Sequence, residues 1–234
     1  MNKKLGIIGG MGPLATVNLF KRIVSLTDAK KDQEHLQITI ENNTKIPDRT
    51  SYILNKGEDP KEELIKSAKI LEKSGAKYLV MPCNTAHYFY DDIIKNINIP
   101  LLNMIEETTN YILKYYPNKK IGLLSTEGTA KSEVYDKYFN KNGVKLYKLD
   151  KEKQDCVSKF IYDIKKGNDK DSISNFKDVL IHLRNQGIEV FILGCTELSA
   201  AYDIYGFEGN FIDPLDVIAK KAIEYGGKKL KGTN

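Results

Sequence analysis

The segment LEKSGAKYLVMPC spans residues 71–83, and a second segment, LRNQGIEVFILGC, spans residues 183–195. The two align without gaps at a constant offset of 112 residues, and their leucine, glycine and cysteine coincide. Self-similarity at a fixed distance is the mark of a structural unit that occurs more than once. In both copies an apolar run separates the glycine from the cysteine, which is typical of a strand buried on both faces. The repeat therefore predicts two similar halves.

A helical pattern precedes each of these predicted strands. In the first half, Asp59 is expected to cap a helix that has Pro60 at its first position and that stops at Gly75. In the second half, the corresponding helix opens at Ser172 and stops at Gly187. Each half thus contains a helix, a glycine, a parallel strand and a cysteine in this order.

Further strands are expected on both sides of this unit. Residues 4–8 and 120–124 correspond to each other, and each apolar run leads into a loop that contains glycine or polar residues. Short strands are also expected at 99–102 and 210–212, followed by Asn103 and Asp213 as helix caps. This alternation of strands and helices predicts an α/β fold with parallel sheets.

The predicted architecture is two similar parallel-sheet α/β domains related by a pseudo-twofold axis, with the active site between them. We expect residues 1–104 to form the first domain and residues 105–212 the second. The C-terminal helix, at about 213–234, is expected to pack back on the first domain. Ligands of open parallel sheets bind beyond the carboxyl ends of the strands, where Cys83 and Cys195 both stand.

Composition excludes several other classes of protein. The chain has 234 residues, 41% of them hydrophobic and 29% charged, which suits a packed globular core. Its net charge of +5 comes from lysines spread along the chain beside 31 acidic residues, which argues against nucleic-acid binding. No segment is apolar enough to span a bilayer, and residues 5–8 are too few for a signal peptide. Three cysteines form no disulfide framework, which favours a cytoplasmic protein.

Two opposed thiols suit one particular chemistry. Inverting an α-carbon needs a base on one face of the substrate and an acid on the other, and a thiolate and a thiol can exchange these roles. The pairs Asn84-Thr85 and Thr196-Glu197 follow the cysteines like first helical turns. A helix N-terminus can lower a thiol pKa from its usual value of about 8.5, and its N–H groups can bind a carboxylate.

Five motifs in order carry a resemblance to a known family. They are GGMGPLAT at 9–16, IPDRT at 46–50, MPCNTAH at 81–87, GCTE at 194–197 and DPLDVIA at 213–219. Together they closely resemble the aspartate racemases of the aspartate/glutamate racemase superfamily. The resemblance runs through nearly the whole chain and includes both cysteines of the repeat.

This resemblance implies a two-domain enzyme, often dimeric, that interconverts L- and D-aspartate without a cofactor or a metal. It implies Cys83 and Cys195 as the acid/base pair, and Arg49 as a carboxylate ligand, for which its planar guanidinium is suited. The family lysine falls on Lys165 or Lys166, of which we choose Lys165. The full set of expected substrate-binding residues is Met11, Arg49, Asn84, Thr85, Thr126, Thr129, Lys165, Thr196 and Glu197.

Other interpretations of single residues are weaker. The loop at 9–13 lacks the G-x-G-x-x-G spacing of a dinucleotide site. His87 could activate Cys83 as in a thiol hydrolase, but we expect it to pack or to orient the loop, because a hydrolase needs no second cysteine. Zinc is disfavoured because only three histidines are present. Arg49 could also be a surface arginine paired with Asp48, and Cys156 has no repeat partner and is expected to be structural.

Alternative functions remain within and outside catalysis. A relative on the same scaffold could act on glutamate, a hydantoin or maleate, and one methylene in the substrate changes binding by only about 1–3 kcal/mol. A two-lobed binding protein for an acidic amino acid would use the same cleft, although it has no need of paired thiols. The expected partners are a small acidic amino acid and a second copy of the chain.

Overall fold

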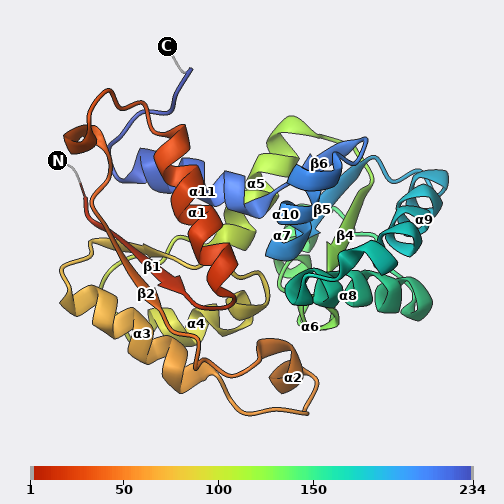
Figure 1. The fold of residues 1–234 in the computed structure, drawn as a ribbon, viewed down its shortest axis with the longest axis horizontal. Coiled ribbons are helices and arrows are strands. Elements are labelled where there is room, and N and C mark those ends of the chain that lie inside the picture. Colours follow the sequence, from red (N-terminus) through yellow and green to blue (C-terminus); the bar gives the residue numbers. More distant parts are fainter. Residues whose placement is uncertain (1–2, 233–234) are drawn as a thin grey trace.

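The computed structural model describes residues 3–232, which form two separate three-stranded parallel sheets flanked by helices (Figure 1). The first sheet has the order β2-β1-β3, with β1 at Leu5–Gly9, β2 at Ile38–Asn42 and β3 at Tyr78–Val80. The second has the order β4-β5-β6, with β4 at Ile121–Ser125, β5 at Val190–Gly194 and β6 at Asn210–Ile212. The predicted α/β fold with two parallel-sheet halves is confirmed.

The internal repeat is visible in the helices that precede β3 and β5. Helix α3 spans Lys61–Lys73 and helix α9 spans Ile173–Asn185, so both their starts and their ends lie 112 residues apart. Each helix is followed by a glycine in the left-handed region, Gly75 at φ 88° and Gly187 at φ 80°. Residues with a side chain rarely adopt this conformation, which explains why the glycine recurs at the same place in both copies.

The start of α3 and one predicted strand differ in detail from expectation. Pro60 is the cap of α3 and not its first helical residue, while the Asp59 carboxylate accepts a hydrogen bond from Lys61 N at 2.9 Å. The segment predicted as a strand at 99–102 makes only a parallel bridge, between Leu101 and Leu79. Its hydrogen bonds to β3 are few, partly because the nitrogen of Pro100 cannot donate one.

Helix α5 (Met104–Tyr115), which follows the bridge at Leu101, packs against helix α11 (Pro214–Tyr225), which follows β6. Asn103 caps α5 and Asp213 caps α11, each by accepting backbone N–H hydrogen bonds, as the sequence predicts. Helix α11 lies against α5 and against α1 (Pro13–Leu26). Its Leu215 and Ile218 belong to the same buried cluster as Leu5 of β1, so the end of the chain completes the core of the first half.

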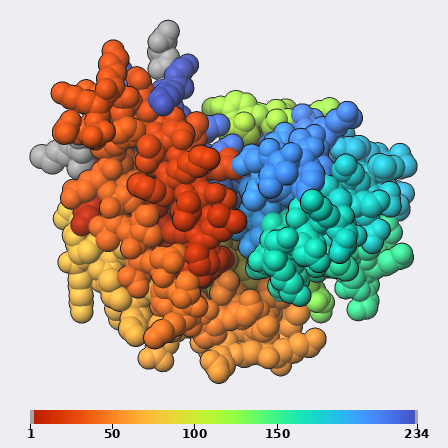
Figure 2. Space-filling model, in the orientation of Figure 1, coloured from red at the N-terminus to blue at the C-terminus, as the bar shows by residue number. Residues whose placement is uncertain are grey.

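The remaining elements complete the two halves. The longest of these remaining helices, α8 (Lys151–Lys166), packs against α9. The others are shorter, and they are α2 (Arg49–Ile53), α4 (Tyr90–Ile94), α6 (Glu127–Lys131), α7 (Asp136–Lys141) and α10 (Thr196–Tyr205). In the space-filling view the red and orange atoms of the first half lie directly against the blue and green atoms of the second (Figure 2). None of the helices within residues 3–232 is both long and apolar enough to cross a membrane.

Candidate active site

A small cavity of about 340 Å³, including the open solvent at its mouth, lies where the two halves meet. Its walls come from loops at the carboxyl ends of β1, β3, β4 and β5, together with α2 and α8. Parallel strands place their carboxyl ends at one edge of a sheet, so distant segments of the chain converge there. The lining residues are Met11, Asp48, Arg49, Thr50, Cys83, Asn84, Thr85, Thr126, Lys165, Gly194, Cys195, Thr196 and Glu197.

The two cysteines of the repeat line this cavity from opposite halves. Cys83 follows β3 and Cys195 is the N-cap residue of α10, and both are free thiols with less than a tenth of their surface exposed. Cys156, which the repeat leaves without a counterpart, is a half-buried free thiol that packs against the core of the second half. Only the cysteines at the repeated position therefore reach the cavity.

His87 holds the loop that carries Cys83. Its Nε2 accepts a hydrogen bond from the backbone N–H of Met104 at 3.1 Å, so Nδ1 carries the proton and donates it to the carbonyl oxygen of Cys83 at 2.8 Å. Burial lowers the pKa of His87 to about 4, which keeps the imidazole neutral. Both ring nitrogens are used by the backbone, in agreement with the loop-orienting role expected from the sequence.

Cys195 has a carboxylate partner that Cys83 lacks. Its Sγ donates a hydrogen bond to Glu197 Oε2 at 2.8 Å, and the Thr196 hydroxyl donates to the same oxygen at 3.3 Å. Burial and the charge of Glu197 raise the pKa of the Cys195 thiol well above its usual value. A helix N-terminus can lower a thiol pKa, but at Cys195 the nearby carboxylate and the loss of water outweigh this effect.

Lys165 supplies a positive charge beside this pair. Its Nζ lies 3.6 Å from Glu197 Oε1, and its side chain is 35% exposed. Although burial opposes it, the acidic groups around it, Cys195 and Glu197 foremost, raise the pKa of Lys165, which therefore stays protonated. The expected substrate lysine thus lines the cavity, where it already has a carboxylate partner, whereas Lys166 is absent from the cavity wall.

Arg49 lies at the start of α2 with one N–H group free. Its Nη atoms donate to the backbone oxygens of Pro47 at 2.9 Å and of Met11 at 3.4 Å, while its buried Nε has no partner within residues 3–232. Asp48 caps α2 through Ser51 N at 2.7 Å, and no Asp48–Arg49 ion pair forms in the described chain. The alternative of a surface ion pair is therefore wrong. A buried donor without a partner in the wall of a cavity is available to a ligand that enters the cavity.

Asn84 offers a second free donor. It is 3% exposed, and its Oδ1 accepts a hydrogen bond from the Tyr135 hydroxyl at 2.6 Å. Its buried Nδ2 has no partner in the part of the chain that the structure describes. Arg49 and Asn84 therefore bring two unsatisfied N–H groups to one cavity, which suits a ligand with carboxylate oxygens.

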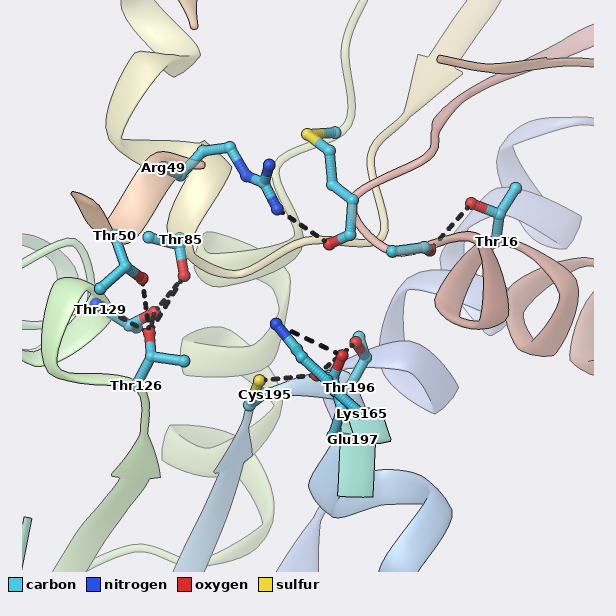
Figure 3. Close-up of polar contacts among 12 residues, drawn as sticks. Thr16, Arg49, Thr50, Thr85, Thr126, Thr129, Lys165, Cys195, Thr196 and Glu197 are labelled. Carbon is cyan, nitrogen blue, oxygen red and sulfur yellow. Dashed lines mark hydrogen bonds and ion pairs between the residues drawn. The ribbon is translucent and has the colours of Figure 1, made fainter. Parts of the chain in front are cut away.

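Four threonine hydroxyls close the cavity on the side of α6 (Figure 3). Thr85 and Thr126 lie 3.3 Å apart, and Thr129 lies 2.7 Å from Thr85 and 3.1 Å from Thr126. Thr50 of α2 donates to Thr126 at 3.4 Å. Of the expected substrate ligands, only Thr129 does not line the cavity, and its hydroxyl bonds to those of Thr85 and Thr126.

The close approach of the halves at this point depends on Gly128. A Cβ atom added to Gly128 would lie 2.7 Å from the Thr50 hydroxyl and 2.8 Å from the Thr50 Cα.

The cavity is also lined by three residues that were not expected from the sequence, namely Thr50, Asp48 and Gly194. All three stand directly beside selected residues in two of the motifs, which is the signal that could have found them. No cluster of three metal-binding side chains occurs within residues 3–232.

Fold and cavity together define a two-lobed α/β protein with one buried thiol from each half and free N–H donors between them. A family model described as Asp/Glu/Hydantoin racemase matches residues 8–222. The chain therefore belongs to the Asp/Glu/Hydantoin racemase family, and the superfamily indicated by the motifs is confirmed.

Individual relatives are similar over nearly the whole chain. The broad specificity amino-acid racemase RacX of Bacillus subtilis (strain 168) is 30% identical over 226 residues, which cover 94% of this chain and 96% of that protein. The solved structure of an aspartate racemase from Picrophilus torridus is 32% identical, with a TM-score of 0.86 and coverage of 98% and 96%. A glutamate racemase structure from Campylobacter jejuni, at 20% identity and a TM-score of 0.65, shares the fold.

Proposed function

We propose that this protein racemises aspartate without a cofactor, with Cys83 and Cys195 as its two proton carriers. The observation that supports this most directly is that cysteines from equivalent positions of two repeated halves line one cavity. The similarity to the aspartate racemase of Picrophilus torridus supports aspartate as the substrate.

Carboxylate binding in this proposal uses the free donors. Arg49 Nε and Asn84 Nδ2 are both buried without a partner, and aspartate carries two carboxylates. We assign the side-chain carboxylate to Arg49, assisted by the charge of Lys165, and the α-carboxylate to Asn84 with the hydroxyls of Thr85 and Thr196. Donors fixed around the α-carboxylate also stabilise the negative charge that develops on it when the α-hydrogen leaves.

Proton transfer then follows from the protonation of the two thiols. Cys195 Sγ donates a hydrogen bond to Glu197 in the free protein, and its raised pKa keeps it a thiol. Because the reaction needs one thiolate, Cys83 is the base of the starting state. The Cys83 thiolate takes the α-hydrogen as a proton from one face, and the Cys195 thiol delivers its proton to the α-carbon from the other. The enzyme is left with a Cys83 thiol and a Cys195 thiolate beside the Lys165 ammonium.

A broader substrate range is the second candidate. The similarity to RacX, whose name states broad specificity, favours it, and several curated glutamate racemases match parts of the chain. One cavity and two carboxylate-binding residues do not by themselves separate aspartate from glutamate, because the two differ by a single methylene.

The test is racemisation of L-aspartate, L-glutamate and L-alanine in heavy water, followed by optical rotation and by loss of the α-proton signal. We expect aspartate to be racemised fastest and the early D-aspartate to be almost fully deuterated, while the remaining L-aspartate keeps its hydrogen. Cys83→Ala and Cys195→Ala should each abolish racemisation, and Cys156→Ala should leave it unchanged.

Other outcomes identify the alternatives. Comparable rates on all three amino acids indicate broad specificity, and binding of aspartate without α-proton exchange indicates a binding protein. Substantial racemisation by Cys195→Ala would contradict the two-thiol mechanism. Added EDTA and extensive dialysis should not reduce the activity, since neither a metal nor a cofactor takes part in the proposed reaction. The homodimer implied by the family resemblance stays a prediction, which the mass of the protein in solution tests.

A further inference from the structure

A buried tyrosine from the second half touches the free amide of the cavity. Tyr135 stands between α6 and α7, is fully buried, and donates its hydroxyl hydrogen to Asn84 Oδ1 at 2.6 Å. It does not line the cavity itself. It therefore acts on whatever the cavity binds only through Asn84.

The bond holds the Asn84 amide with its oxygen toward Tyr135. An asparagine amide has an acceptor end and a donor end, and the oxygen of Asn84 is turned to Tyr135. The nitrogen is then left buried and unpartnered in the cavity wall. Burial, together with the charge of Asp213, raises the pKa of the Tyr135 phenol well above its usual value, so the phenol keeps the hydrogen that it donates.

We propose that Tyr135 is a positioning residue that aims the Asn84 N–H group at a substrate carboxylate. The proposal rests on the proposed function for the identity of that carboxylate. Asn84 follows β3 in the first half and Tyr135 belongs to the second, so the amide is aimed only when the halves are together. A reversed amide would point its oxygen at a carboxylate and repel it.

The chain contains a matched control in the same region. Asn103 of the first half donates through Nδ2 to the Tyr138 hydroxyl of the second at 2.8 Å. This is also a bond between an asparagine and a tyrosine across the two halves, but neither residue lines the cavity of the cysteines. Tyr138→Phe therefore measures what the loss of such a bond does to the fold, separately from any effect on the amide of Asn84.

The experiment is a double-mutant cycle of Tyr135→Phe and Asn84→Ala, with Tyr138→Phe as the control. We expect Tyr135→Phe to lower kcat/KM for aspartate about tenfold, the usual worth of one hydrogen bond of about 1.4 kcal/mol. In the Asn84→Ala background the same change should lower kcat/KM less than about twofold, because no amide remains to be aimed. Tyr138→Phe should change kcat/KM less than about twofold.

Equal losses from Tyr135→Phe with and without Asn84 would overturn the proposal, as would an unchanged kcat/KM in the single variant. Tyr135→Phe keeps the ring in place, and thermal unfolding of each variant verifies that it is folded. Protection of Cys83 from iodoacetamide by aspartate gives a second readout that needs no turnover. Weaker protection in Tyr135→Phe than in the parent protein supports the positioning role even if racemisation is absent, whereas equal protection contradicts it.

Discussion

Cys195 donates a hydrogen bond to the carboxylate of Glu197, two residues further along the chain, at a distance of 2.8 Å. The residue at the same position after Cys83 is Thr85, whose hydroxyl contacts Thr126 and Thr129 and carries no charge. Both halves therefore carry a thiol at the repeated position, but only the thiol of the second half has a carboxylate two residues later. The pair of thiols is therefore electrostatically unequal before any substrate binds, and Cys195 is the one that holds its proton.

Glu197→Gln should make Cys195 more reactive toward iodoacetamide. Burial and Glu197 together raise the pKa of this thiol, so removing the negative charge lowers the pKa and increases the thiolate fraction at a given pH. Each 1.4 kcal/mol of lost repulsion gives about tenfold more thiolate. Mass spectrometry of the alkylated peptides provides the rates, with Cys156 in the same sample as the reference. A Cys195 rate equal to that of the parent protein would show that Glu197 does not control the proton.

The same substitution should reshape the dependence of activity on pH. Racemisation needs one thiolate and one thiol, so the profile of kcat/KM should be bell-shaped with values that belong to the pair. The alkaline limb reports the loss of the last thiol proton, and Glu197→Gln should move this limb to lower pH. A profile that stays at its plateau up to strongly alkaline pH, in a protein that is still folded, is the result that this mechanism does not allow.

The repeat made the architecture and both cysteines predictable from the sequence. Helices of equal length followed by Gly75 and Gly187, and strands leading to Cys83 and Cys195, follow from local patterns that occur twice. Contacts across the halves have no such pattern. The bond from Tyr135 to Asn84 joins residues 51 positions apart, and nothing around Tyr135 in the sequence signals it.

For Arg49 as well, the motif predicts the residue but not its contacts. Its motif marks it as a carboxylate ligand, but the orientation that leaves Nε free comes from backbone oxygens in two separate loops. For Thr129, the expectation from the sequence and the observed contacts differ. The family resemblance placed it among the substrate ligands, whereas its hydroxyl bonds to Thr85 and Thr126 and it does not line the cavity.

Arg49→Ala should lower kcat/KM for aspartate about 10- to 100-fold, since a charge-assisted hydrogen bond is worth about 1.5–3 kcal/mol. Any activity on alanine should fall much less, because alanine has no side-chain carboxylate for the guanidinium to bind. Arg184→Ala is the control, since Arg184 lies over the Phe191 ring and not at the cavity. An equal loss on both substrates would assign Arg49 to the α-carboxylate or to the fold, and no loss would remove it from the site.

The last prediction concerns a buried carboxyl, that of Asp213, which contacts both halves. Asp213 caps α11, accepts a hydrogen bond from the Ser199 hydroxyl at 2.8 Å and pairs with Arg22 of α1 at 2.9 Å. Burial raises its pKa to about 6 in spite of Arg22, while nearby Asp216 adds to the increase. In the unfolded chain an aspartate has a pKa of about 3.9. At pH values between the two pKa values, the folded protein therefore binds more protons than the unfolded chain.

Protonated Asp213 therefore stabilises the fold at low pH, and this contribution is lost as the pH rises through about 6. Asp213→Asn keeps an oxygen for the helix cap but cannot ionise. We expect the free energy of unfolding of the parent protein, relative to Asp213→Asn, to fall by about 2 kcal/mol between pH 4.5 and pH 7.5. Urea unfolding of both proteins at the two pH values measures it. Asp203→Asn removes the exposed partner of Arg22 and should show no such change relative to the parent protein. If the difference between the parent protein and Asp213→Asn is the same at both pH values, the carboxyl is already ionised in the folded protein at pH 4.5, and Arg22 outweighs its burial.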